Sequence, residues 1–193
     1  MAIPRTFVFV DGENLVMRYQ AMVAAGAKPK KNVIHIPDVF VWHQEITTWS
    51  CMDIGRVTYY TSTIGDQQRL FKLRSQIADT TFNYNYDPSD DVQPGLAQLL
   101  PKIFHKSSKS QKTRNVDINI VIDVMRAAHL DSASLLYILS GDGDYLPLVE
   151  EVGRHGKEIW MSAFSSGLNE QLCSSVDLFQ GLDDFFFSHV PKP

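Results

Sequence analysis

Cysteine, long apolar runs and excess positive charge are all scarce in this sequence of 193 residues. Two cysteines, Cys51 and Cys173, are too few and too far apart to predict a disulfide framework or a zinc site. No apolar stretch approaches the roughly 18–20 residues that a membrane-spanning helix needs. The run from Phe7 to Val10 is also shorter than the ~7–15 apolar residues of a signal peptide. We therefore expect a cytoplasmic protein that does not associate with membranes.

The net charge of −4 argues against a protein that coats nucleic acid indiscriminately. One segment departs from this balance, because residues 102–115 hold four lysines, one arginine and no acidic residue. Such a segment either contacts a nucleic-acid backbone or serves as a solvated, solubilising loop. The sequence favours neither interpretation over the other.

Strand patterns and helix patterns alternate along the chain. Strands are predicted at 6–10, 56–61, 81–86, 135–139 and 158–163, and helices at 15–25, 37–49, 67–78, 116–130, 145–155 and 168–175. Prolines interrupt the stretch 87–115, for which we expect a short helical piece and an exposed loop. This alternation predicts one α/β domain over 1–193, with three layers and a mainly parallel central sheet.

Aspartates follow two of the predicted strands. Asp11 comes directly after the first strand, and the apolar run Leu135–Leu139 is followed by Ser140-Gly141-Asp142-Gly143-Asp144. Open α/β sheets bind their ligands at the carboxyl ends of strands, near the point where the strand order reverses. We expect these carboxylates to meet there.

Two further aspartates, Asp117 and Asp123, lie on the helix predicted at 116–130. Each aspartate alone has an ordinary explanation as a turn, cap or surface residue. Several carboxylates at one edge repel one another unless a cation neutralises them, and hard ions such as Mg²⁺ or Mn²⁺ prefer oxygen ligands. Such a site suits phosphodiester hydrolysis without a covalent nucleophile. Ser140 is accordingly interpreted as a turn residue that lies near substrate.

Three motifs, in this order, resemble those of the NYN domains, which are relatives of the PIN-domain nucleases. They are Phe7–Leu15 (FVFVDGENL), Arg114–Asp117 (RNVD) with Asp123 following, and Leu139–Tyr145 (LSGDGDY) with Gly156-Lys157 following. The likeness is greatest to the stand-alone, LabA-like branch and covers residues 6 to about 183. It implies a PIN-like α/β/α fold.

The resemblance also implies a metal-dependent ribonuclease that acts on RNA, more readily on single strands. Asp11, Asp117 and Asp142 match the family's metal-binding acids, Asp144 matches a fourth, and Asp123 matches the second aspartate of the helix. Asn14 matches a polar residue that orients the first acid or the substrate. Arg18, Lys112 and Arg114 are further candidates for contact with RNA phosphates, although Arg114-Asn115 replaces the usual Lys-Gly. Analogy with related small nucleases adds a homodimer as an expectation.

Two other classes of function stay open. One is a non-catalytic RNA-binding or regulatory module that keeps the acids. The other is a different metal-dependent phosphohydrolase. An aspartyl-phosphate phosphatase would show Asp-x-Asp after its first strand, and Asp11-Gly12-Glu13 counts against it.

Overall fold

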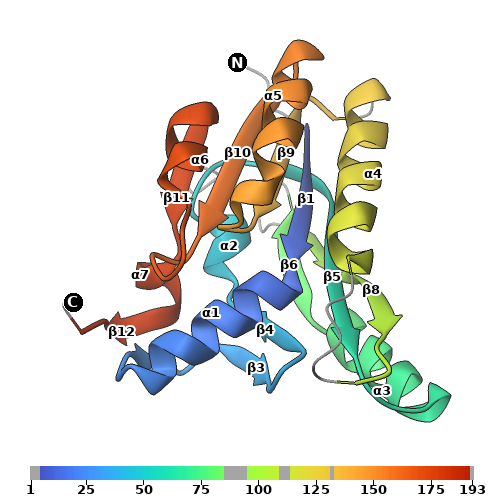
Figure 1. The fold of residues 1–193 in the computed structure, drawn as a ribbon, viewed down its shortest axis with the longest axis vertical. Helices are drawn as coiled ribbons and strands as arrows, with labels where there is room; N and C mark the ends of the chain where they lie inside the picture. The colour runs from blue at the N-terminus through green and yellow to red at the C-terminus, as the bar shows by residue number, and fades with distance from the viewer. Residues whose placement is uncertain (1–4, 85–94, 109–113, 131–132, 192–193) are drawn as a thin grey trace.

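The computed structural model describes residues 5–84, 95–108, 114–130 and 133–191. Six parallel strands form the central sheet in the order β11-β10-β9-β1-β5-β8 (Figure 1). Their bounds are β1 Arg5–Asp11, β5 Asp53–Thr63, β8 Leu100–His105, β9 Leu135–Leu139, β10 Glu158–Ala163 and β11 Leu178–Gly181. The chain runs outward from β1 through β5 to β8 and then returns to β9, on the other side of β1. The strand order therefore reverses between β1 and β9.

Helices cover both faces of this sheet, which confirms the three-layer α/β/α fold. They are α1 Gly12–Ala24, α2 Glu45–Thr48, α3 Gln67–Ala78, α4 Asn115–His129, α5 Leu146–Arg154, α6 Glu170–Ser175 and α7 Asp183–Phe186. The side chains of α4, α5 and α6 pack in one core cluster, and those of α1, α2, α3 and α7 pack in the other. Among the described helices, none is long and apolar enough to cross a membrane.

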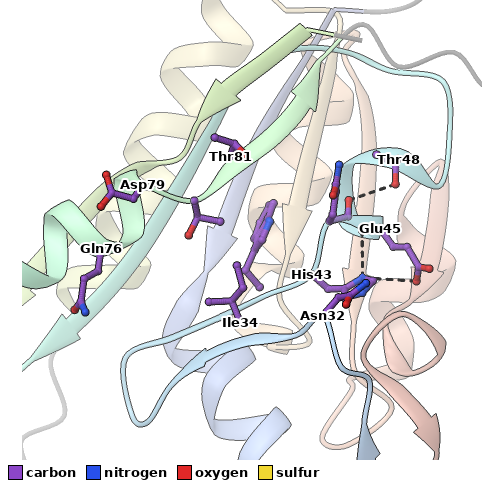
Figure 2. Close-up of a pocket in the computed structure, with 11 residues that line it drawn as sticks. Asn32, Ile34, His43, Glu45, Thr48, Gln76, Asp79 and Thr81 are labelled. Atoms are coloured by element: carbon purple, nitrogen blue, oxygen red, sulfur yellow. Dashed lines mark hydrogen bonds and ion pairs between the residues drawn. The ribbon is translucent and has the colours of Figure 1, made fainter. Parts of the chain in front are cut away.

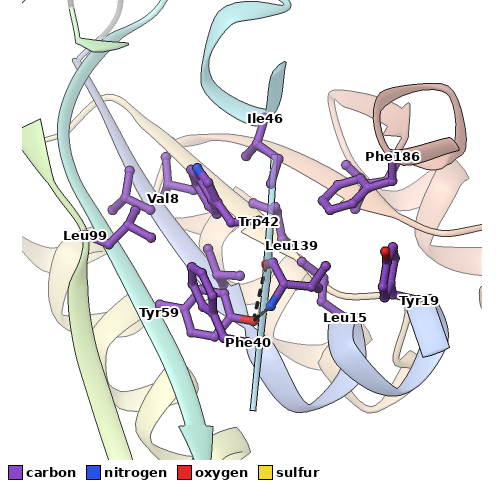
Figure 3. Packing of buried hydrophobic residues seen from close by; sticks show 14 of the residues in the cluster. Val8, Leu15, Tyr19, Phe40, Trp42, Ile46, Tyr59, Leu99, Leu139 and Phe186 are labelled. Atoms are coloured by element: carbon purple, nitrogen blue, oxygen red, sulfur yellow. Dashed lines mark hydrogen bonds between the residues drawn. The ribbon is translucent and has the colours of Figure 1, made fainter. Parts of the chain in front are cut away.

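Three antiparallel pairs of short strands flank the sheet. They are β2 Lys28–Pro29 with β12 Phe187–His189, β3 Ile34–Ile36 with β4 Phe40–Trp42, and β6 Thr81–Tyr84 with β7 Gly95–Gln98. The β3–β4 hairpin packs beneath α1 and supplies part of one core. In Figure 3, Phe40 and Trp42 of this hairpin lie beside Tyr59 of β5. The buried Tyr59 hydroxyl accepts a hydrogen bond from Val41 N at 3.1 Å, so the hairpin is joined to the sheet by a polar contact as well.

Burial on both faces explains the uninterrupted apolar runs in β1 and β9. Val8 and Val10 of β1 belong to one core cluster, whereas Phe9 between them belongs to the other. Successive side chains of a strand point to opposite faces, so a sheet covered on both sides selects an uninterrupted apolar run. The same holds for Leu135–Leu139, in which all five side chains are buried.

The strongest sequence patterns have the bounds that were predicted for them. The helix 67–78 and the strands 135–139 and 158–163 have the predicted bounds. Helix α1 begins at Gly12, three residues before the predicted start, because Asp11 caps it. Helix α6 begins at Glu170, two residues later than predicted.

The helix predicted at 37–49 is wrong. Asp38 has φ 62° and forms the turn between β3 and β4, and only Glu45–Thr48 is helical. A left-handed aspartate at a hairpin turn ends any helix there. The apolar positions 39, 42, 46 and 49 have helical spacing, but the consecutive run Phe40–Trp42 is buried as a strand.

The stretch 87–115 also differs from its prediction. Within its described part, residues 95–105 form β7 and the edge strand β8 rather than a helical piece. Residues 85–94 and 109–113 lie outside the described residues, as do the last two positions of the strand predicted at 81–86. On α4, Val121 is 37% exposed, whereas Ile120 and Val124 are buried.

Candidate functional site

The end of β1 places a buried carboxylate at the reversal of strand order. Asp11 is the N-cap of α1, and its Oδ1 accepts a hydrogen bond from Asn14 N at 3.0 Å. Its Oδ2 accepts another from Ser140 Oγ at 3.0 Å, across the boundary between β1 and β9. With 3% of its surface exposed, Asp11 is held in one position by both neighbours.

Gly12 lets α1 begin close against the neighbouring strand. A Cβ atom on this residue would lie 2.3 Å from Cε1 of Tyr59 and 2.6 Å from the carbonyl oxygen of Tyr60. A side chain would push the first turn of α1 away from β5. The glycine of Asp11-Gly12 therefore brings the capping aspartate to the edge of the sheet.

The turn after β9 is tied to the same place. Gly141 N donates to Asn14 Oδ1 at 3.2 Å, and Asp142 N donates to Ser140 Oγ at 3.2 Å. Asp142 in turn caps the following turn, since its Oδ1 accepts from Asp144 N at 3.0 Å. Asn14 and Ser140 thus hold the acidic turn in place through these hydrogen bonds.

Asp117 reaches this edge from the first turn of α4. The hydroxyl of Tyr145 lies 3.4 Å from Asp117 Oδ1 and 3.4 Å from Asp11 Oδ2, so one buried hydroxyl joins two acids that are far apart in sequence. Tyr145 ends the motif Leu139–Tyr145 but was not among the site residues predicted from the sequence. The available signal was its hydroxyl group, because the hydroxyl of a buried tyrosine usually forms a hydrogen bond.

Burial and mutual repulsion raise the pKa values of these acids. Burial, with smaller contributions from the charges of Asp117 and Glu13, raises the pKa of Asp11 to about 7, despite the hydrogen bonds from Asn14 and Ser140. Burial and then the charge of Asp142 raise the pKa of Asp117, with further contributions from Glu13 and Asp144. The carboxylates are therefore close enough to repel one another.

Glu13 is a member of this group that sequence reasoning missed. Its carboxylate accepts a hydrogen bond from Ser62 and forms an ion pair with Lys106, the residue that follows β8. The acidic set at this edge therefore comprises Asp11, Glu13, Asp117, Asp142 and Asp144. The sequence signal for Glu13 was its position two residues after Asp11, in the first turn of the helix.

Asp123 is held apart from this set. Its carboxylate accepts hydrogen bonds from Tyr60 at 2.7 Å and from Lys102, and it pairs with Arg126 at 3.1 Å. Burial would raise the pKa of Asp123, but these hydrogen bonds and charges outweigh burial and lower it. This carboxylate is already neutralised by the protein, and we leave it out of the candidate metal ligands.

Some of the described basic residues form ion pairs with acids, and others do not. Lys102 and Lys106 pair with Asp123 and Glu13, whereas Arg114 is exposed at the start of α4. Lys112 lies outside the described residues. Arg18 is half-buried on α1, one helical turn beyond Asn14.

The donor set fits a divalent cation in its chemistry. Oxygen ligands of like charge, held close together, are what Mg²⁺ and Mn²⁺ bind. Over the described residues, no three His, Cys, Asp or Glu side chains stand in a geometry ready to hold a metal. Binding of an ion would thus require these carboxylates to rearrange around it.

A hollow of about 570 Å³ lies elsewhere, between the β3–β4 hairpin, α2 and the end of α3 (Figure 2). Its polar wall is internally paired, because Glu45 binds Lys30 at 3.3 Å and Glu45 N donates to His43 Nδ1 at 3.2 Å. None of the five clustered carboxylates lines it. This hollow is therefore not the candidate site.

Comparisons with known proteins agree with this architecture. A sequence model of the NYN domain matches residues 5–183. A crystal structure of a protein of unknown function from Vibrio parahaemolyticus is similar in fold, with a TM-score of 0.59, 19% identity and coverage of 96% of both chains. A search of the curated proteins found no match.

Proposed function

This chain belongs to the NYN family of the PIN-like superfamily, and from this premise we propose that it is a metal-dependent endoribonuclease. The observation that carries the proposal is the convergence of Asp11 and Asp117 on one Tyr145 hydroxyl, 3.4 Å from each. These acids come from β1 and α4, and Asp142 comes from the turn after β9. A role as a turn or cap residue would explain each aspartate by itself, but it would not explain why the three lie close together.

Asp11, Asp117 and Asp142 would hold Mg²⁺ or Mn²⁺, with Asp144 at the margin, while Glu13 is paired with Lys106. When bound, the ion supplies an activated water and neutralises charge on the phosphate and the leaving oxygen. Ser140 fixes one oxygen of Asp11 through its 3.0 Å hydrogen bond, and Asn14 fixes the turn that carries Asp142. Hydrogen bonds of this kind limit the orientations that the ligands, and therefore the reacting phosphate, can adopt.

The test is incubation of labelled single-stranded RNA and single-stranded DNA with Mn²⁺, beside a sample with excess EDTA. We expect RNA to be cut internally, EDTA to abolish the reaction, and Asp142→Asn to lose it. Cleavage that is equal with and without Asp142 would contradict the proposal, because it would come from a contaminant or another site.

A non-catalytic RNA-binding module is the second candidate. The observation that favours it is the present conformation of Asp142, whose Oδ1 caps its own turn by accepting from Asp144 N at 3.0 Å. That function predicts RNA binding by the wild type with no cleavage of any strand in Mg²⁺ or Mn²⁺.

A further inference from the structure

Arg18 is a cation on α1 for which the described residues supply no counter-charge. Its Nε is buried without a hydrogen-bond partner, and no ion pair joins its guanidinium to another described residue. Arg18 follows Asn14 by four residues on α1, so both side chains lie on the same face of the helix. A guanidinium that is half-buried without a counter-charge is prepared for an anion.

The guanidinium lies on bare backbone at Gly167. A Cβ atom there would be 2.0 Å from Cζ and 2.2 Å from Nη1 of Arg18, and Gly167 has φ 68°. Both facts favour glycine, because a side chain would displace the arginine and the backbone conformation is one that side chains disfavour.

The loop that carries Gly167 also rests on the acidic turn. Asn169 N donates to the carbonyl of Gly141 at 3.0 Å. Around Gly141, the Leu168 Cα and the Gly167 oxygen lie 3.4 and 3.5 Å from the position of a Cβ. Arg18, residues 164–169 and the turn that bears Asp142 are therefore packed as one unit, which fixes the guanidinium relative to the carboxylates.

We propose that Arg18 binds a backbone phosphate of the RNA adjacent to the scissile phosphate, and that Gly167 is the platform that holds it there. This inference rests on the proposed function. The charges that weigh most on Asp11 and Asp117 are those of other carboxylates, not that of Arg18, so the guanidinium neutralises neither acid. Its planar fork suits two oxygens of one phosphate.

The experiment measures the affinity of a single-stranded oligoribonucleotide by fluorescence anisotropy across a salt series, with Ca²⁺ in place of Mg²⁺ and intact RNA verified on a gel. Loss of one phosphate contact lowers the slope of log K against log salt by about 0.7 for single strands. We expect this decrease, with roughly tenfold weaker binding at low salt, for Arg18→Gln. Arg18→Lys keeps the slope and loses part of the affinity, because an ammonium lacks the fork.

Two glycines provide a matched pair for the platform. Gly156 has the same φ of 68° as Gly167, but nothing lies within 4 Å of its Cβ position. Gly156→Ala and Gly167→Ala therefore share the backbone strain, and only the second collides with Arg18. We expect Gly167→Ala alone to weaken RNA binding and to lower the salt slope.

The double variant separates a platform from a general disturbance of the loop. If Gly167 acts through Arg18, Gly167→Ala adds less than a twofold loss in the Arg18→Gln background. An unchanged salt slope for Arg18→Gln, or equal losses for the two glycine variants, would overturn the inference while Asp142-dependent cleavage still stands. A wild type that neither binds nor cuts RNA would overturn both the inference and the proposed function.

Discussion

Helix α4 carries two aspartates, six residues apart, in opposite circumstances. Asp117 faces other carboxylates at the carboxyl end of β1, and its pKa is raised. Asp123 faces Lys102, Arg126 and the Tyr60 hydroxyl, and its pKa is lowered. Both aspartates match acids of the family motif. Asp123 is neutralised by Lys102 and Arg126, whereas Asp117 can still bind a cation. The partners of a carboxylate decide its role more than its place in a motif.

The largest effect that separates the two regions is expected in catalysis. Asp11→Asn or Asp117→Asn should lower RNA cleavage by more than about 100-fold, since each removes a ligand charge from the site. Steady-state cleavage of labelled RNA measures it. Asp66 offers a matched control, because it caps α3 as Asp11 caps α1, accepting from Arg69 N at 2.8 Å. Asparagine caps helices about as well as aspartate, so Asp66→Asn should keep full activity, and equal losses would point to folding rather than chemistry.

Raised and lowered pKa values should also give the two regions opposite dependence of stability on pH. The folded Asp11 has a pKa of about 7 against an ordinary 3.8, so between these values the native state holds a proton that the unfolded state has released. Stability of the metal-free protein should therefore fall with rising pH in this window, by up to about 1.4 kcal/mol per pH unit. Urea unfolding in EDTA at several pH values measures it, and Asp11→Asn should flatten the slope. An identical slope in the variant would remove Asp11 as its cause.

A smaller effect is expected from the hydroxyl that joins the acids. Tyr145→Phe keeps the buried ring but removes the donor that lies 3.4 Å from Asp11 and from Asp117. Groups that orient metal ligands typically contribute about 10-fold or more to affinity, so Mn²⁺ should bind about 10-fold more weakly. Tyr137→Phe is the control, since its buried hydroxyl pairs with Ser162 and touches no acid. Equal Mn²⁺ affinity in the Tyr145 and Tyr137 variants would leave the hydroxyl without a role.

The smallest effect on cleavage is expected from Asp123→Asn. This variant should change RNA cleavage less than about threefold, because the carboxylate is already paired and its ion pairs are partly exposed. Stability should fall by about 1 kcal/mol near neutral pH. Because the folded pKa of Asp123 is lowered, this contribution is present above its ordinary 3.8 and is lost as the pH falls through the lower folded value. Thermal unfolding at pH 7 and pH 3 measures the difference. A loss of cleavage as large as that of Asp117→Asn would erase the contrast between the two regions.

The sequence predicted best where local pattern and tertiary burial agree. Leu135–Leu139 is apolar at every position because both faces of β9 are covered, and the following Gly and Asp residues mark its end unambiguously. The strand order then brings Asp11 beside Ser140, as parallel pairing of β1 with β9 requires. These features follow from topology, so the meeting of Asp11 with the acidic turn could be predicted.

Other features depend on partners that no local pattern reveals. Apolar positions 39, 42, 46 and 49 fit a helix, but the left-handed Asp38 turns the chain into a hairpin. Glu13 belongs to the acidic set because its charge helps to raise the pKa values of Asp11 and Asp117, even though Ser62 and Lys106 also contact it. Asp123 leaves it because Lys102 lies on the strand opposite. The Asp38 turn is local, but the environments of Glu13 and Asp123 are set by residues more than 18 positions away in the sequence.

The central claim is that Asp11 and Asp117, but not Asp123, bind one divalent cation. Isothermal titration of Mn²⁺ into the protein at pH 8, above the pKa of about 7 for Asp11, tests it most directly. We expect the wild type and Asp123→Asn to bind Mn²⁺ with equal affinity, and Asp11→Asn and Asp117→Asn to lose most of it. Mn²⁺ binding that survives in Asp11→Asn and Asp117→Asn, or that disappears in Asp123→Asn, would contradict the account.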